Sequence, residues 1–168
     1  PADGLKFHAP LGDGAADHVA VTIDGQAKSL QLPAVVASEA GHIAAAAYKA
    51  TPGVTIEVPE AGDFEKDQGF TLAAWVKLPK ADSGGAVFAR MDDQSDYRGW
   101  DLWIENGRPG THIINKWEED ALKVVASDPL PAGQWAHVRV TYDGSGKAGG
   151  VKILVNGQPQ GVRVAKDQ

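Results

Sequence analysis

Apolar and polar side chains alternate most clearly in two segments, FTLAAWVKL (residues 70–78) and QWAHVRVTY (residues 134–142). Successive side chains of a β-strand point to opposite faces, so a period of two residues predicts a strand with one buried face. In both segments the apolar residues share one face, and a tryptophan, Trp75 or Trp135, falls on the other, more polar face. That tryptophan either packs under loops or presents an aromatic surface to a ligand. The expected core residues, one of them from a later segment, are Phe70, Leu72, Val76, Val138, Val140, Tyr142 and Ile153.

Short strand-like segments separated by turn signals continue along the whole chain. Asn-Gly and Asp-Gly dipeptides at residues 106–107, 143–144 and 156–157 favour hairpin turns, because both residues tolerate a positive φ. No amphipathic helix pattern is evident. The sequence therefore predicts one all-β domain over residues 1–168, a two-sheet antiparallel β-sandwich of the jelly-roll type. Strands are expected at residues 5–9, 18–23, 42–48, 54–58, 69–78, 85–90, 99–105, 110–115, 121–126, 134–142 and 151–155.

The composition narrows the classes of function. A formal net charge of −6 disfavours binding to the phosphate backbone of nucleic acid. No apolar run approaches the roughly 20 residues that cross a membrane as a helix. The chain has no cysteine for disulfides, thiolate catalysis or zinc–thiolate sites. It begins at Pro1 without a charged and apolar leader, so we expect any targeting signal outside this chain.

Three stretches in combination resemble a known family: GDFEKDQGFTLAAWVKLP (residues 62–79), GAVFARMDD (residues 85–93) and GQWAHVRVTYDGSGKAGGVKILVNGQ (residues 133–158). The aspartate-phenylalanine lead-in, the FTxxAWVK strand, the GQWxHVxVTYDG strand and the following VxxxVNG segment resemble laminin-G-like, concanavalin A-like jelly rolls. This resemblance covers about residues 54–157. The stretch that starts RMDDQSDYRGWDLWIENG is most similar to the version found in large multidomain planctomycete proteins, next to cytochrome-like modules.

The resemblance implies two antiparallel sheets and a non-catalytic module that binds glycans or proteins, with a calcium ion at the sandwich rim of some members. It also implies a larger exported bacterial protein, and hence an extracytoplasmic location. Such domains continue past the VNG turn with strands that close a sheet, whereas residues 158–168 leave room for one short strand. We therefore expect missing closing strands and an open sheet edge that invites pairing with a partner strand.

Candidate catalytic residues are few. Glycosidases need two carboxyl groups, about 5–5.5 Å apart for retention or about 6.5–9.5 Å apart for inversion. The Glu-x-Asp-x-x-Glu string of the glucanase relatives does not occur. Asp101 and Glu105 share a strand face, but a rise of about 3.3 Å per residue places them about 13 Å apart. The serines lack a nucleophile-elbow context, and the histidines are scattered, so the sequence predicts no enzyme.

Charged and aromatic residues gather in segments 90–98 and 116–120, which a hairpin about residues 106–109 places at the same end of a sheet. Carboxylates, an arginine and an aromatic ring suit a sugar. Aspartate oxygens also suit calcium, which takes 6–8 oxygen ligands. A solvated turn of mutually paired charges explains the same residues. The predicted ligand-binding residues are Asp92, Asp93, Asp96, Arg98, Trp117 and Glu118, and the predicted calcium ligands are Asp92, Asp93 and Asp96.

Trp100 and Leu102 share a strand face that is expected to pack inward, whereas Trp117 is expected at the rim. The leading functional hypothesis is a non-catalytic recognition module for carbohydrate. The alternative is a structural or protein-docking domain that positions neighbouring modules, and a weaker alternative is a glycoside hydrolase.

Overall fold

The computed structural model describes residues 4–12, 14, 17–33 and 36–168. Two compact units, Pro1–Asp63 and Phe64–Gln168, divide the chain. Each has a hydrophobic cluster of its own. The β-sandwich belongs to the second unit, and the single domain over residues 1–168 stays a prediction.

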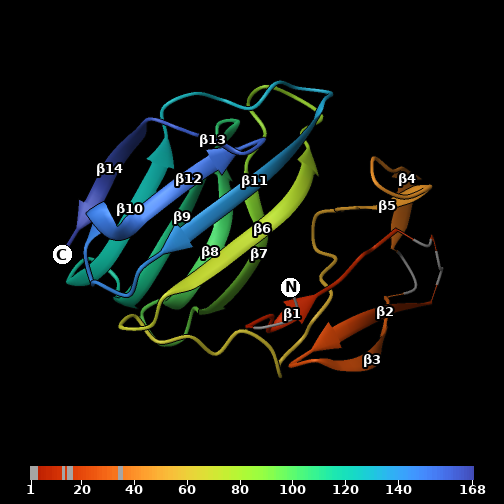
Figure 1. The fold of residues 1–168 in the computed structure, drawn as a ribbon, viewed down its shortest axis with the longest axis horizontal. Helices are drawn as coiled ribbons and strands as arrows, with labels where there is room; N and C mark the ends of the chain where they lie inside the picture. Colours follow the sequence, from red (N-terminus) through yellow and green to blue (C-terminus); the bar gives the residue numbers. More distant parts are fainter. Residues whose placement is uncertain (1–3, 13, 15–16, 34–35) are drawn as a thin grey trace. The chain divides into compact units, whose positions relative to one another are not determined.

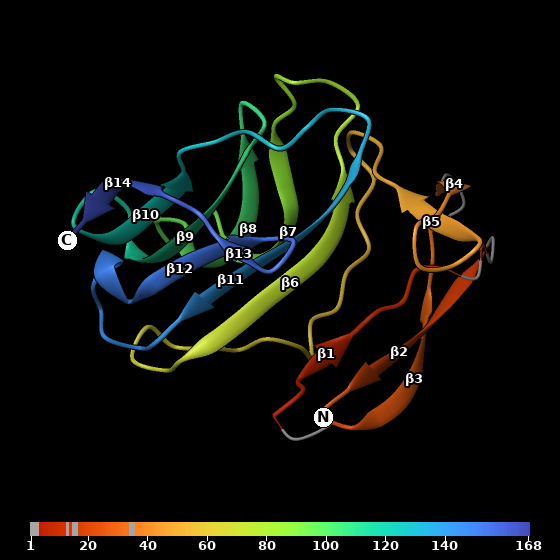
Figure 2. The same ribbon diagram turned by 45° about the horizontal axis from the view of Figure 1, so that its top comes forward.

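The second unit consists of two antiparallel sheets that lie one against the other (Figures 1 and 2). The larger sheet contains, in spatial order, β14 (Val162–Asp167), β10 (Asp120–Ala126), β9 (Arg108–Lys116), β8 (Arg98–Glu105) and β7 (Gly85–Asp92). The smaller sheet contains β13 (Gln158–Pro159), β12 (Val151–Val155), β11 (Trp135–Tyr142) and β6 (Phe70–Lys77). A single 3-10 turn, η1 (Ala148–Gly150), precedes β12. No helix in the described residues is long and apolar enough to span a membrane.

The core lies between the two sheets. Its residues confirm the prediction drawn from the alternation of apolar and polar side chains. All seven residues predicted for the core are buried, and Val138 and Val140 are completely shielded from solvent. Trp100 and Leu102 are also buried, as predicted, on the inner side of β8. The ring of Phe70 packs against that of Trp100, with 5.8 Å between the centroids.

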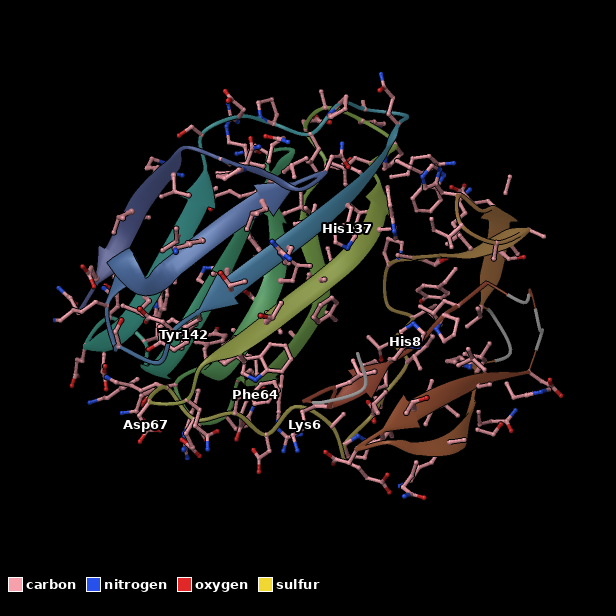
Figure 3. All side chains as sticks on the ribbon, viewed as in Figure 1. Lys6, His8, Phe64, Asp67, His137 and Tyr142 are labelled. Atoms are coloured by element: carbon pink, nitrogen blue, oxygen red, sulfur yellow. The ribbon has the colours of Figure 1, made fainter. Side chains whose placement is uncertain are left out.

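Tyr142, at the end of β11, fixes the segment that leads into the sandwich. Its hydroxyl donates to the carbonyl of Lys66 and accepts from the backbone N–H of Gly146 at 2.7 Å. Figure 3 shows Tyr142 at the same end of the unit as Phe64 and Asp67. One buried side chain therefore joins the lead-in segment to the loop after β11.

The C-terminal segment contributes two strands rather than the one short strand expected. At Gly161, whose carbonyl accepts from the N–H of Ser127 at 2.8 Å, the chain leaves β13 of the smaller sheet and enters β14 of the larger one. Strand β14 pairs with β10, so this sheet does gain an edge strand after the VNG turn. Its other side carries no strand in the described part of the chain, and partner-strand pairing there stays a prediction.

The first unit contains a three-stranded sheet, β1 (Phe7–His8), β2 (His18–Ile23) and β3 (Gln26–Gln31), and a hairpin of β4 (Ala37–Ala40) and β5 (Ala46–Lys49). Strand β2 has the predicted bounds. Strand β3 was not predicted, because QAKSLQ has no apolar alternation and is almost entirely exposed. The strand predicted at 54–58 is wrong: Val54 closes a turn with Thr51, and Ile56 and Val58 pack on the small cluster from a loop.

Candidate functional site

The five-stranded sheet presents a polar and aromatic surface on the side turned away from the core, here called the outer face. Alternate residues of β8, β9, β10 and β14 form it, because the residues between them supply the core. Strand pairing aligns these side chains in rows across the sheet. The outer face comprises Asp101, Trp103 and Glu105 of β8, Arg108, Gly110 and His112 of β9, Lys123 and Val125 of β10, and Arg163 and Lys166 of β14.

A carboxylate–imidazole pair lies in the middle of this face. Asp101 accepts from the backbone N–H of His112 at 2.7 Å, and its second oxygen lies 2.8 Å from Nδ1 of the His112 ring. Asp101 is only 4% exposed, although it belongs to the outer face. A carboxylate bound to Nδ1 orients the imidazole and favours the proton on that nitrogen. In neutral His112 the free acceptor is therefore Nε2.

Two tryptophan rings contact His112 edge-on. The Trp103 centroid lies 5.6 Å and the Trp117 centroid 5.8 Å from that of His112. Lys166 of β14 places its ammonium 5.5 Å from the Trp117 centroid. The indole N–H of Trp103 is buried and has no hydrogen-bond acceptor among the described residues. A buried donor without an acceptor costs about 1–3 kcal/mol.

Sequence reasoning missed the Asp101–His112 pair. The alternation pattern relates Asp101 only to Glu105 of its own strand, and it gives His112 no partner. The Asn106-Gly107 turn contains the missing signal, because it sets Glu105 opposite Arg108. Counting outward from that pair in steps of one residue places Asp101 opposite His112.

The rim segments do approach one another, as predicted. The backbone N–H of Trp117 donates to the carbonyl of Asp96 at 3.0 Å, which joins the loop after β7 to the turn after β9. Asp96 and Tyr97 adopt positive φ angles of 51° and 60°, so this loop turns sharply before β8 begins.

Two aspartates of the rim loop form hydrogen bonds with neighbouring residues of the same loop. Asp92 accepts from the hydroxyl of Ser95 at 2.8 Å and from the N–H of Gln94 at 2.9 Å. These two hydrogen bonds, that from Ser95 first, lower the pKa of the Asp92 carboxyl. Asp93 lies 3.3 Å from the side-chain amide of Gln94. Asp92 therefore closes its own turn.

Arg98 and Glu118 have partners outside the loop. Arg98 binds both carboxylate oxygens of Glu65, at 2.8 and 2.6 Å. Glu118 pairs with Lys166 at 2.7 Å. Glu65 is 33 residues from Arg98 in the sequence, so the spacing around the rim could not reveal this partner.

The geometry gives no support to a calcium site at the predicted aspartates. Among the residues that the structure describes, no group of three or more His, Asp or Glu side chains is arranged to hold a metal ion. Both oxygens of Asp92 already accept hydrogen bonds from its own turn. Calcium at Asp92, Asp93 and Asp96 stays a prediction without a structural observation in its favour.

Glu105 lies near the opposite end of the outer face and is held by two cations. Its carboxylate pairs with Lys123 of β10 and, at 2.8 Å, with Arg163 of β14. The hydrogen bond from Lys123 is the main cause of a lowered pKa of the Glu105 carboxyl, which the contacts with Arg163 reinforce. Asp101 and Glu105 thus have separate partners, and the structure does not join them into a catalytic pair.

The lowered pKa of Glu105 predicts a pH-dependent contribution to stability. A folded-state pKa below the unfolded value stabilises the fold above the unfolded pKa, and the gain is lost as the pH falls through the folded one. Glu105→Gln should therefore be less stable than wild type at pH 7, by about 1 kcal/mol. The difference should begin to shrink as the pH falls below about 4.3, the ordinary pKa of a glutamate, and should be lost as the pH falls further through the lowered pKa of the folded protein. Urea denaturation of both proteins between pH 7 and pH 3 measures it, and a pH-independent difference would contradict the assignment.

The side of the smaller sheet that is turned away from the core carries Trp75 and Trp135, the two tryptophans on the polar faces of the alternating segments. Trp75 of β6 is 40% exposed and packs against His137 of β11, with 5.3 Å between the centroids. Figure 3 shows His137 on this sheet. Trp135 lies below the ammonium of Lys77, 5.3 Å from its ring centroid. Trp75 is therefore partly exposed on this side of the sheet, and its contact with a ligand stays a prediction.

Comparison with known proteins agrees with this architecture. A family model described as concanavalin A-like lectin/glucanases superfamily, of the laminin G type, matches residues 49–168. No curated protein matches the chain. The matched residues span the whole β-sandwich and most of the chain. The chain belongs to the concanavalin A-like lectin/glucanase superfamily.

Proposed function

We propose that this chain is a non-catalytic recognition module that binds carbohydrate, within a larger exported bacterial protein. The observation that carries the proposal is the pair of tryptophan rings around the Asp101–His112 pair on the outer face. Carbohydrate sites combine an aromatic ring, which covers the apolar side of a sugar, with a few fixed polar groups for its hydroxyls. Trp117 supplies such a ring, and His112 supplies an oriented acceptor.

The predicted rim residues have two roles in this proposal. Asp96 and Glu118, which lie next to Trp117, and Asp93 of the same loop as Asp96 are proposed as contacts to the ligand. Asp92 and Arg98 hold the loop in place through their contacts with Ser95 and Glu65. The rim is then a preorganised edge of the site, which reduces the entropy lost on binding.

Two observations favour recognition over hydrolysis. The Asp101 carboxylate is occupied by His112 and the Glu105 carboxylate by Lys123 and Arg163. A glycosidase needs two carboxyl groups that share one glycosidic bond between them. The two acidic residues of β8 instead act as partners of neighbouring strands.

A glycan array combined with a reducing-sugar assay tests the proposed function. Binding of a glycan without release of reducing ends is the expected result. Release of reducing ends would overturn the non-catalytic assignment and favour a glycoside hydrolase. Silence in both assays would overturn carbohydrate binding and favour a structural or protein-docking domain, for which exposed Trp75 offers one surface.

Trp117→Ala should weaken binding to an array-positive glycan by about 1 kcal/mol, or roughly fivefold, because the stacking surface is lost. Isothermal titration calorimetry with that glycan measures the change. Trp75→Ala is the matched control, since it removes an indole from the other sheet and should leave the affinity unchanged. A loss with Trp75→Ala and none with Trp117→Ala would move the site to the smaller sheet.

A further inference from the structure

A hollow of about 350 Å³ opens at the end of the outer face that carries Glu105. This volume is within the range of about 300–1,000 Å³ that small ligands occupy. The end of β8, the start of β9, the end of β10 and the start of β14 meet here. The hollow is lined by Glu105, Asn106, Arg108, Ala126, Ser127 and Arg163.

The charge around this hollow is positive, although the chain carries a net charge of −6. Lys123 and Arg163 share the single carboxylate of Glu105. Arg108 forms no ion pair with any carboxylate of the described residues; its contacts are with backbone carbonyls. The hollow itself is lined by two guanidinium groups, those of Arg108 and Arg163, and by one carboxylate, that of Glu105, which leaves an excess of one positive charge in an otherwise acidic protein.

The Arg108 guanidinium is held in place before any ligand arrives. Its Nε donates to the carbonyl of Ser127 at 3.1 Å, and its Nη1 donates to the carbonyl of Asn106 at 3.3 Å. A guanidinium has five N–H donors, so three remain after these two bonds. Positive φ angles of 49° at Asn106 and 76° at Gly107 form the tight turn that presents the Asn106 carbonyl.

We propose that this hollow binds the carboxylate of an acidic sugar, a uronic acid residue within a polysaccharide; this inference rests on the proposed carbohydrate binding. The planar fork of a guanidinium matches a carboxylate with two parallel hydrogen bonds, and such charge-assisted bonds are the strong ones. Arg108 provides the fork, and Arg163 adds a second guanidinium at the open edge strand.

The neighbouring residues extend the site along the strand. Trp103 lies two positions before Glu105 on the same face of β8, a distance of about 6.6 Å along the strand. A polysaccharide chain running along the outer face would then meet Arg108 with one residue, and Trp103 and His112, the latter about 13 Å from Arg108 along β9, with residues further along the polymer. An acidic polymer thus uses both the positive end and the aromatic middle of the face.

Binding of soluble polygalacturonate, compared with its fully methyl-esterified form, tests the inference by isothermal titration calorimetry. The wild-type protein should bind polygalacturonate, lose most of that affinity on esterification, and bind more weakly as salt rises. Arg108→Gln should lower the affinity for polygalacturonate by about tenfold or more, since one strong charge-assisted contact is removed. Arg139→Gln is the matched control, because this exposed arginine of β11 belongs to the other sheet and its loss should change nothing.

Two further variants keep the test decisive. Arg108→Lys retains the charge but not the fork, so it should also lose affinity. Arg163→Gln replaces an exposed side chain of the edge strand and carries the test if Arg108→Gln fails to fold. Circular dichroism and thermal melting establish that each variant is folded.

Several outcomes would overturn the inference. One such outcome is that the wild-type protein binds the esterified polymer as tightly as polygalacturonate. Another is that Arg108→Gln and Arg163→Gln bind polygalacturonate as tightly as the wild type does. Either result would show that the hollow does not recognise a carboxylate, while carbohydrate binding itself would stand. Binding of a sulfated polysaccharide as tight as that of polygalacturonate would show that the hollow is not specific for a carboxylate. Equal binding of polyglutamate would assign the hollow to acidic peptides. Failure to bind either polymer, together with a positive glycan array, would overturn this inference and leave carbohydrate binding standing, whereas silence on the array as well would overturn both.

Discussion

Trp100→Ala should destabilise the β-sandwich by about 3–5 kcal/mol, the usual cost of truncating a large buried aromatic residue. Trp100 is 8% exposed and lies at the centre of an aromatic group in the core. Its ring centroid is 5.8 Å from those of both Phe64 and Phe70 and 6.3 Å from that of Phe88. Alanine would leave three rings without their common neighbour, and a rigid β-sandwich closes such a cavity only partly.

Urea denaturation followed by intrinsic fluorescence measures this effect, and Trp117→Ala is its control. Trp117 is only half-buried and lies beside the outer face in the turn after β9, where its loss opens no cavity in the core. We expect a change of less than about 1 kcal/mol in its free energy of unfolding. Should Trp117→Ala unfold the protein while Trp100→Ala leaves it intact, the assignments of core and outer face would be reversed.

The sequence allowed prediction of the features that depend on local periodicity. Alternation located the seven core residues and the inward side of β8, and the Asn106-Gly107 turn located the hairpin of β8 and β9. Each of these signals is contained in fewer than ten consecutive residues. The same signals failed for β3, where QAKSLQ pairs with β2 although it buries almost nothing.

The candidate site depends on contacts between strands that are distant in sequence, and here the sequence was a weaker guide. Glu105 meets Arg163, which is 58 residues away, only because β14 returns to pair with β10. Arg108 gains its backbone partner Ser127 from the end of β10. The clustered charges at the rim predicted a ligand-binding site, yet most of them form hydrogen bonds or ion pairs with other residues of the protein.

Gly99→Ala should destabilise the protein more than Trp100→Ala does. We expect a loss of at least about 4 kcal/mol in the free energy of unfolding, which is exceptional for the addition of one methyl group. Gly99 is the second residue of β8, opposite Met91 of β7, and has a φ of +137°, a conformation that L-residues rarely adopt. A Cβ atom at this position would lie 1.8 Å from the carbonyl oxygen of Arg90 and 2.9 Å from the Cα of Met91. Both neighbours are backbone atoms of the paired strand, so no side-chain rotation can relieve the overlap.

Two other glycines separate the overlap from the backbone conformation. Gly157→Ala introduces a side chain at a φ of +80° with no atom within 4 Å, so only the conformational cost of about 1–2 kcal/mol is expected. Gly149→Ala also meets open space and has no positive φ, so its stability should change by less than about 0.5 kcal/mol. Urea denaturation of the three variants should rank them Gly99, Gly157, Gly149 in order of decreasing loss. If Gly99→Ala lost no more free energy of unfolding than Gly157→Ala, this result would contradict the close approach of β7 and β8, which places the rim loop beside Trp117.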